Sequence, residues 1–352
     1  MSKSPVILYK ISSHIDDRLF FADRKREAEQ LIAGVQASEE LLAEENGTPE
    51  NPRAHAALGD LIMHRAQFLF NEGRYDESEK AIKSWKPMSD STLEKRSEIY
   101  LKTALDKVRV ARGEIDLAIE HLKEIVSIGQ SDSGNDALQE SDVNWATVIL
   151  CQIYCFQGEK ESYTSALAEL EPRITALITS ESQGEFITSD FRILKCEALM
   201  GLGRFQEAET ELETLQNDLR LPTQVGNPRA PSQLACTKRM KARCYHSQKM
   251  WAEAITAWTE ALQQQRVSIS DITSGEFEKK YDIVVSIYSL GVAYLHQGEK
   301  IGKKYVEIAK AYPPALKYPD GKTDYTRWLA KIEDEHLQIE SSRNFISRLF
   351  HL

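Results

Sequence analysis

Residues 201–212, with the sequence GLGRFQEAETEL, decide the predicted fold. Gly203 is free to adopt the left-handed conformation that ends a helix, because glycine has no Cβ. After it, Phe205, Ala208 and Leu212 follow at spacings of three and four residues, which places them on one face of a helix. Ala208 is small at a position where a second helix must approach closely. The stretch therefore predicts the turn and the second helix of a helical hairpin.

The same pattern recurs along most of the chain. Turn markers stand at positions 73, 113, 158, 203, 249 and 298, so successive turns are 40 to 49 residues apart. Recurrence in this range is typical of α-solenoids. We predict an all-α fold, a superhelical array of antiparallel helix hairpins, with residues 1–352 forming a single domain. Its parts are expected to be an N-terminal helix in 1–50, about six hairpins over 55–312, a capping helix in 320–352, and loops at 127–142 and 217–232.

The repeated residues resemble the tetratricopeptide repeat. Gly291, Tyr294 and Gly298 match the first half of that pattern. The aromatic residue after the turn and the packing alanine of the second helix recur at Tyr75, Phe205, Trp251, Ala118, Ala208 and Ala254. The tetratricopeptide period is about 34 residues, so these units are longer than the family's. The third unit departs from the pattern at Lys160 and Tyr163, and the sixth at Lys300 and Lys303.

The resemblance implies a concave groove lined by the first helix of each hairpin. A peptide or a partner protein is expected to lie in this groove. Aromatic and arginine side chains are the usual anchors of such an interface. The expected groove-facing residues are Gln67, Asn71, Tyr100, Lys107, Trp145, Gln152, Phe156, Glu197, Arg239, Arg243, His246, Tyr288 and His296.

The composition excludes some partners. The chain has 352 residues and a formal net charge of −10 at pH 7. Binding to a phosphate backbone requires a positive field, so no nucleic-acid partner is expected. No apolar run is long enough for a signal peptide or a membrane span, and we therefore expect an intracellular, cytoplasmic protein without membrane contact.

The five cysteines are an odd number and indicate reduced thiols. Cys151 and Cys155 share a helix face, but a zinc site needs four converging ligands, and the chain has no Cys-x-x-Cys. The repeat places Cys151 and Cys196 at the small-residue position of other units. We therefore expect small core residues here, and neither a metal nor another cofactor.

Arg239 and Arg243 are four residues apart and share a helix face with His246 nearby. One interpretation is that they receive a carboxylate or phosphate of an acidic partner. The other is that they are ordinary solvated charges that pair with acidic neighbours.

The final helical stretch has apolar positions at Trp328, Leu329, Ile332, Leu337 and Ile339. We expect it to cap the array, because an end repeat needs its apolar face covered. A detachable tail that binds a partner is the alternative.

The chain contains no catalytic motif, which favours a non-enzymatic interaction module or scaffold. A scaffold inside a larger assembly, with contacts to several subunits, is compatible with the same pattern. The alternative of another class is an enzyme that uses the hollow of the solenoid as a small-molecule pocket. Its acid and base would come from separate repeats, from among Glu197, His246, Tyr288 and His296.

Overall fold

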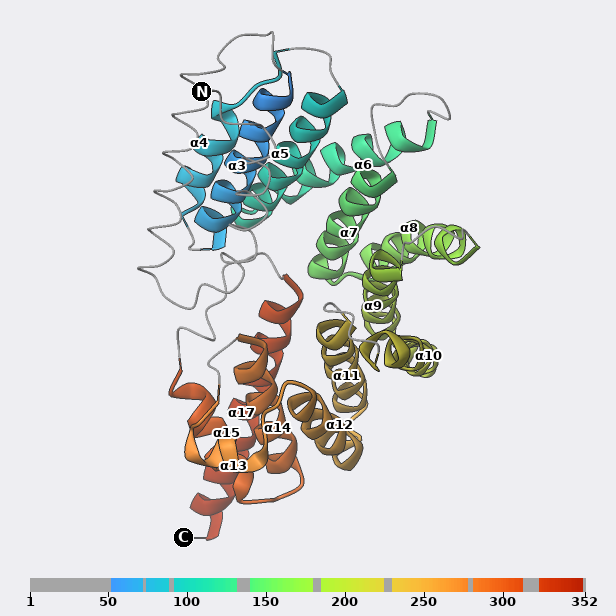
Figure 1. The fold of residues 1–352 in the computed structure, drawn as a ribbon. Coiled ribbons are helices and arrows are strands. Elements are labelled where there is room, and N and C mark those ends of the chain that lie inside the picture. The colour runs from blue at the N-terminus through green and yellow to red at the C-terminus, as the bar shows by residue number, and fades with distance from the viewer. Residues whose placement is uncertain are drawn as a thin grey trace. The chain divides into compact units, whose positions relative to one another are not determined.

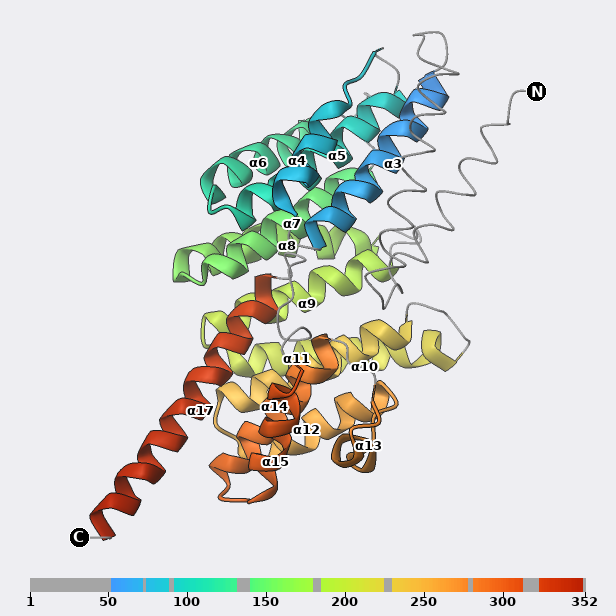
Figure 2. The ribbon, with the colours of Figure 1, turned by 90° about the vertical axis from the view of Figure 1, so that its left-hand side faces the viewer.

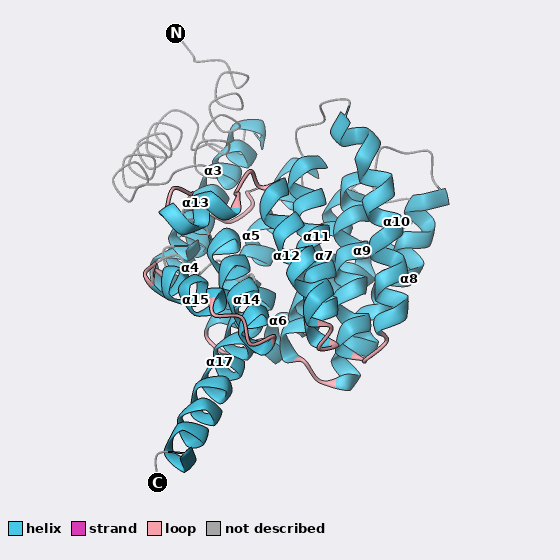
Figure 3. Ribbon diagram, turned by 90° about the horizontal axis from the view of Figure 1, so that it is seen from below, coloured by secondary structure: helices cyan, strands magenta, loops and turns pink. Residues whose placement is uncertain are grey.

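The computed structural model describes residues 52–350, except for 72–73, 89–91, 132–139, 180–184, 225–229, 278–280 and 313–322. The helix predicted in residues 1–50 lies outside this part. Within it, all regular structure is helical and no strand occurs (Figure 3). The prediction of an all-α solenoid class is confirmed.

The chain divides into two compact units, and the boundary falls inside helix α7 (Glu140–Gln157), after Ile153. The sequence-based expectation that residues 1–352 form a single domain stays a prediction. The other helices of the first unit are α3 (Pro52–Asn71), α4 (Tyr75–Ser84), α5 (Thr92–Ala111) and α6 (Ile115–Ser131). Helix α3 packs on both α4 and α5, and α5 packs on α6 (Figure 1).

The second unit continues the succession of antiparallel pairs (Figure 2). Each helix packs on the next, from α8 to α12 and then from α12 through α14 to α15. Helix α9 also contacts α11, as α3 contacts α5 in the first unit, so the first helices of consecutive hairpins touch. The helices are α8 (Lys160–Thr179), α9 (Glu185–Gly201), α10 (Phe205–Gln224), α11 (Ala230–Ser247), α12 (Trp251–Gln264), α13 (Ile269–Ser274), α14 (Tyr281–His296), α15 (Ile301–Lys310) and α17 (Thr323–Phe350).

The predicted turns are present where the structure describes them. Gly113, Gly158, Gly203 and Gly298 have φ between 68° and 83°, and Lys249 takes the same left-handed conformation with φ of 60°. Gly73 lies outside the described residues. The packing alanines Ala118, Ala208 and Ala254 are completely buried, as predicted. Both Cys151 and Cys196 are also completely buried.

The sixth hairpin keeps a small packing residue, but one position earlier than the pattern places it. Lys300 and Lys303 are exposed, while Gly302 is buried against Gly291 of α14. A Cβ on Gly302 would lie 2.5 Å from the carbonyl oxygen of Gly291. The apparent departure of this unit is therefore a shift of register, and two glycines allow the backbones to approach.

In the third hairpin a large residue takes the small-residue position and packs on the next hairpin. Tyr163 of α8 packs on Gly201 of α9, where a Cβ would lie 2.3 Å from the ring. Two predicted loops are shorter than expected, because α10 continues to Gln224 and α6 to Ser131. In α10, Leu219 extends the buried seam and is 4% exposed, so packing prolongs the helix towards Pro222.

Candidate functional site

Three groove residues predicted in the first unit meet on consecutive first helices. The ammonium group of Lys107 on α5 donates a hydrogen bond of 3.0 Å to Gln67 Oε1 on α3. The same ammonium nitrogen lies 5.3 Å from the centroid of the Trp145 ring on α7. Trp145 is 40% exposed, which is unusual for the largest apolar side chain. Gln67, Lys107 and Trp145 are named the Trp145 surface.

The other groove residues predicted on α3, α5 and α7 are Asn71, Tyr100, Gln152 and Phe156. Tyr100 accepts hydrogen bonds from Arg96 on the same helix. Gln152 is half-buried, and it follows Trp145 by two helical turns. Phe156 is half-buried and belongs to the second unit. Asn71 ends α3, and its side chain lies outside the described part.

The two arginines predicted to receive an acidic partner face carboxylates of this chain. Arg243 makes two hydrogen bonds to Glu197, of 2.8 Å and 3.2 Å, and both side chains are buried. Arg239 lies 3.0 Å from Asp282. Both arginines thus pair with acidic neighbours, and they are buried rather than solvated, whereas Asp282 is partly exposed. Bidentate contacts of this kind fix the arginine geometrically.

The C-terminal helix α17 lies against these residues. Its Trp328 is 4% exposed, and the Arg243 guanidinium carbon lies 4.9 Å from the ring centroid. The indole N–H donates a hydrogen bond of 2.9 Å to Ser289 Oγ on α14. Lys331 donates to Ser247 Oγ on α11 at 3.1 Å. Helix α17 therefore reaches the first helices of two consecutive hairpins, α11 and α14.

One carboxylate of α17 joins two of the predicted histidines. Glu335 Oε2 lies 2.9 Å from His246 Nε2 and 3.7 Å from His296 Nε2. The His296 ring stacks on Trp251 at 4.0 Å, and His246 meets Trp251 and Trp328 edge-on. Burial lowers the pKa of His246, and the hydrogen bond to Glu335 opposes this only in part. The neutral imidazole with its proton on Nε2 fits this geometry.

Burial also lowers the pKa of His296, although the charge of Glu335 works against it. Burial alone would raise the pKa of Glu335. The hydrogen bond from His246 and the nearby charges together outweigh burial and hold the pKa of Glu335 below its ordinary value. The docked arrangement thus favours a neutral His246 beside an ionised Glu335.

Acidification is expected to weaken the packing of α17 on the rest of the second unit. A His246 released from burial has an ordinary pKa of about 6.5, above the docked value, so the released state binds the proton more readily. The stability of docking is complete above that pH and declines as pH falls through it. Lys331 of α17 and His296 of α14 also face His246, and a charged imidazole would repel both when they are protonated.

Amide hydrogen exchange of α17, corrected for the intrinsic pH dependence, measures this effect. Protection should fall between pH 8 and pH 5 relative to the amides of α14. A His246→Gln variant keeps a donor for Glu335 and should show a smaller pH dependence. Protection of α17 that is independent of pH in the unmodified chain would contradict the expectation.

The last predicted groove residue, Tyr288, is completely buried. Its hydroxyl lies 3.5 Å from His336 Nδ1 of α17, and Lys310 of α15 donates to the same nitrogen at 3.0 Å. Burial raises the pKa of the Tyr288 phenol. The four acid and base candidates are therefore engaged in contacts within the second unit.

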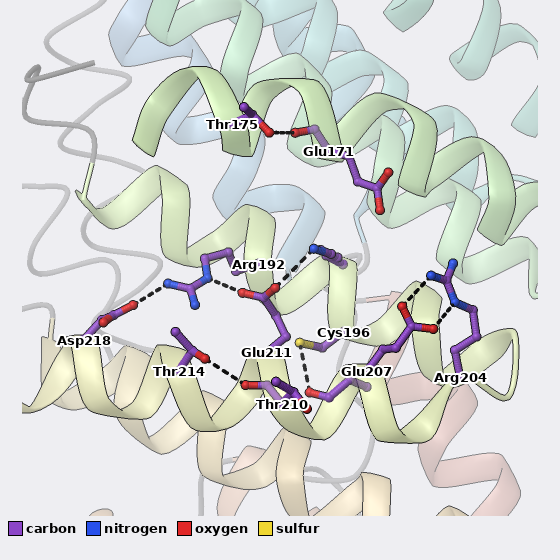
Figure 4. A network of polar contacts seen from close by, with 12 residues as sticks. Glu171, Thr175, Arg192, Cys196, Arg204, Glu207, Thr210, Glu211, Thr214 and Asp218 are labelled. Carbon is purple, nitrogen blue, oxygen red and sulfur yellow. Dashed lines mark hydrogen bonds and ion pairs between the residues drawn. The ribbon is translucent and has the colours of Figure 1, made fainter. Parts of the chain in front are cut away.

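A further polar network joins α9 and α10 (Figure 4). Arg192 forms ion pairs with Glu211 and Asp218, and Lys195 lies 3.1 Å from Glu211. Burial alone would raise the pKa of Glu211, but the hydrogen bond from Arg192 lowers it. These contacts connect the two helices of one hairpin, so the network is structural.

All five cysteines lie in the described part of the chain and form no disulfide, and Cys236 is the one among them that is partly accessible. In the described part of the chain, no group of three His, Cys, Asp or Glu side chains could hold a metal ion. No described helix is long and apolar enough to cross a membrane.

Sequence reasoning missed Lys331, Glu335 and His336 as contacts of the groove residues. Trp328 was recognised only as an apolar position of the final helix. The signal was present, because Trp328, Ile332 and Glu335 are spaced by four and three residues and share one helix face. A carboxylate on an apolar stripe indicates a polar partner opposite. Leu337, in contrast, lies on the outward face and is 57% exposed.

Comparison with known proteins supports the fold. No family model and no curated protein matches the chain. A Rap protein, solved in complex with Competence and Sporulation Factor, is similar over 94% of this chain and 80% of that one, with 14% identity and a TM-score of 0.53. BtubC (BKLC) from P. vanneervenii is similar over 84% of this chain and 93% of that one, with 14% identity. The TM-score for this pair is 0.39.

At 14% sequence identity, the similarity to the Rap protein shows the fold and nothing more. The chain is therefore an all-α helical-repeat protein.

Proposed function

We propose that the chain is a divergent tetratricopeptide-like interaction module without enzymatic activity, and that it binds a protein segment on the Trp145 surface. The observation that carries this proposal is the exposed Trp145 ring beneath the Lys107 ammonium group, at 5.3 Å. Exposed tryptophan beside a cation is typical of interaction hot spots. The Rap protein of similar fold was solved with a bound factor, which is in keeping with this proposal.

The chemistry of the surface defines the partner. An apolar or aromatic side chain of the partner packs on the free part of the Trp145 ring. A carboxylate of the same segment approaches Lys107, whose position is fixed by its hydrogen bond to Gln67. The partner is therefore an acidic segment with an apolar anchor. The hydrogen bond between Gln67 and Lys107 and the contact of Lys107 with Trp145 exist before a partner binds, which lowers the cost of binding.

Site-specific photocrosslinking in an extract of the source cells tests the proposal. A photoreactive amino acid at Gln152, two turns from Trp145 on the same helix, should capture a protein partner. The capture should be lost when Trp145→Ala is combined with it. The same photoreactive group at Leu117, exposed on α6 of the same unit, is the matched control and should not capture that partner.

Equal capture from both positions would contradict the proposal. So would capture at Gln152 that persists after Trp145→Ala.

A further inference from the structure

The second unit carries a helix-binding surface that this chain fills with its own C-terminal helix. The inward positions of α17 are Trp328, Ile332, Glu335 and His336. An end cap for the sixth hairpin needs contacts only with α14 and α15. Helix α17 instead contacts Arg243, His246 and Ser247 of α11, in the preceding hairpin. It therefore lies along first helices, where the repeat resemblance places a ligand.

The receptor side of this contact is built without α17. Glu197 of α9 holds Arg243 by two hydrogen bonds. Trp251 of α12 and His296 of α14 stack on each other at 4.0 Å with an interplanar angle of 7°. A cation, a stacked aromatic pair and the Ser289 hydroxyl are thus fixed by α9, α12 and α14. A preorganised receptor lowers the entropic cost of binding a helix.

The contact of α17 combines packing on the apolar core of the second unit with several polar contacts. Trp328 meets a guanidinium group and a hydroxyl, Glu335 meets a buried imidazole, and Lys331 meets Ser247. Among the described side chains of α17, Leu329 and Ile332 are the buried aliphatic ones, and with Trp328 they join the apolar core. Hydrogen-bonded and charged contacts beside apolar packing are common where two parts separate reversibly.

We propose that the surface formed by Arg243, His246, Trp251 and Ser289 binds an amphipathic helix of another protein, in competition with α17. The partner helix carries an aromatic residue, an aliphatic residue four positions later and a carboxylate seven positions after the aromatic residue, as α17 does at Trp328, Ile332 and Glu335. The surface is separate from the Trp145 surface, so either proposal can fail without the other.

A second copy of this chain is a poor competitor, because exchange of α17 between two copies replaces each contact by an identical one. A partner helix with the same pattern displaces α17 only by binding more tightly. Until such a partner binds, α17 occupies the surface, since a tethered segment acts at an effective concentration of about millimolar.

A labelled peptide with the sequence of residues 323–341 is the probe for this surface. It is titrated into three full-length chains: unmodified, Glu335→Lys, and Leu337→Lys. Glu335→Lys places a cation against His246 and should release the internal helix, so the peptide should bind at least tenfold more tightly than to the unmodified chain. This gain follows because apparent affinity scales with the fraction of the receptor that is open.

Leu337→Lys changes the outward face of α17 and should leave the affinity unchanged. A peptide that itself carries Glu335→Lys should bind the Glu335→Lys chain at least tenfold more weakly than the unmodified peptide. Trp328→Ala in the full-length chain provides a second, independent release of α17 and should give the same gain. Circular dichroism verifies that each variant keeps its helices.

Equal peptide affinities for the Glu335→Lys and Leu337→Lys chains would overturn the proposal, as would binding that does not saturate. Light scattering decides the remaining alternative. A mass of two chains that falls to one chain in the Glu335→Lys variant would assign the surface to α17 of a second copy, and would equally overturn the proposal.

Discussion

Replacing Glu197 by alanine is expected to lower the free energy of unfolding by about 3–5 kcal/mol. Glu197 is 8% exposed and Arg243 is 7% exposed, so water cannot replace the lost carboxylate. The guanidinium group would keep its positive charge in a poorly hydrated position, and that cost exceeds the value of the pair itself. Urea denaturation of the two proteins measures the difference.

The matched control is Glu213→Ala in the same unit. Glu213 pairs with Lys241 at 2.9 Å, between α10 and α11, but its side chain is 55% exposed. An exposed ion pair contributes at most about 1 kcal/mol, so this variant should lose little stability. Equal losses in the two variants would show that Arg243 is not buried as described.

Gly302→Val is expected to destabilise the second unit by about 3 kcal/mol or more, above the range typical for an overpacked core. The atoms nearest to an added Cβ are the Gly291 carbonyl oxygen at 2.5 Å and the Leu295 backbone nitrogen at 2.8 Å. Backbone atoms cannot turn aside as a side chain can, so α14 and α15 would have to separate. The separation would expose the apolar seam that Leu295 and Val306 form between these helices.

Urea denaturation also measures this loss, and Lys303→Val is the control. Lys303 is exposed on the neighbouring position of α15, so its replacement reports only the helix propensity of valine, at most about 0.7 kcal/mol. If both valine variants lost the same stability, the close contact between the two glycines would be refuted.

The hairpin succession could be predicted because it depends on local signals. The turn residues, which are glycines in all but one hairpin, and the alanines at positions 118, 208 and 254 mark hairpins without knowledge of distant contacts. The sixth hairpin resisted this reasoning, since its small residue, Gly302, is displaced by one position. The extent of α10 was underestimated for a related reason. Burial of Leu219 outweighs the helix-breaking tendency of Pro222, and α10 continues to Gln224.

The candidate sites were predictable only in part. A repeat register indicates which positions share the first-helix face, and Gln67, Lys107 and Trp145, which it assigns to that face, contact one another. It could not show what already occupies that face in the second unit. The contacts of Glu335 with His246 and His296 join residues 89 and 39 positions apart, and no local pattern specifies such a pairing.

The central claim is that the chain binds a protein segment through the Trp145 surface. Its most direct measurement is the affinity of the crosslinked partner, once purified, for the unmodified chain, for Trp145→Ala and for Leu117→Ala. Loss of a hot-spot tryptophan costs about 2 kcal/mol or more, so Trp145→Ala should weaken binding roughly 30-fold. Leu117→Ala should bind like the unmodified chain. Unchanged affinity for Trp145→Ala, or an equal loss in both variants, would contradict the account.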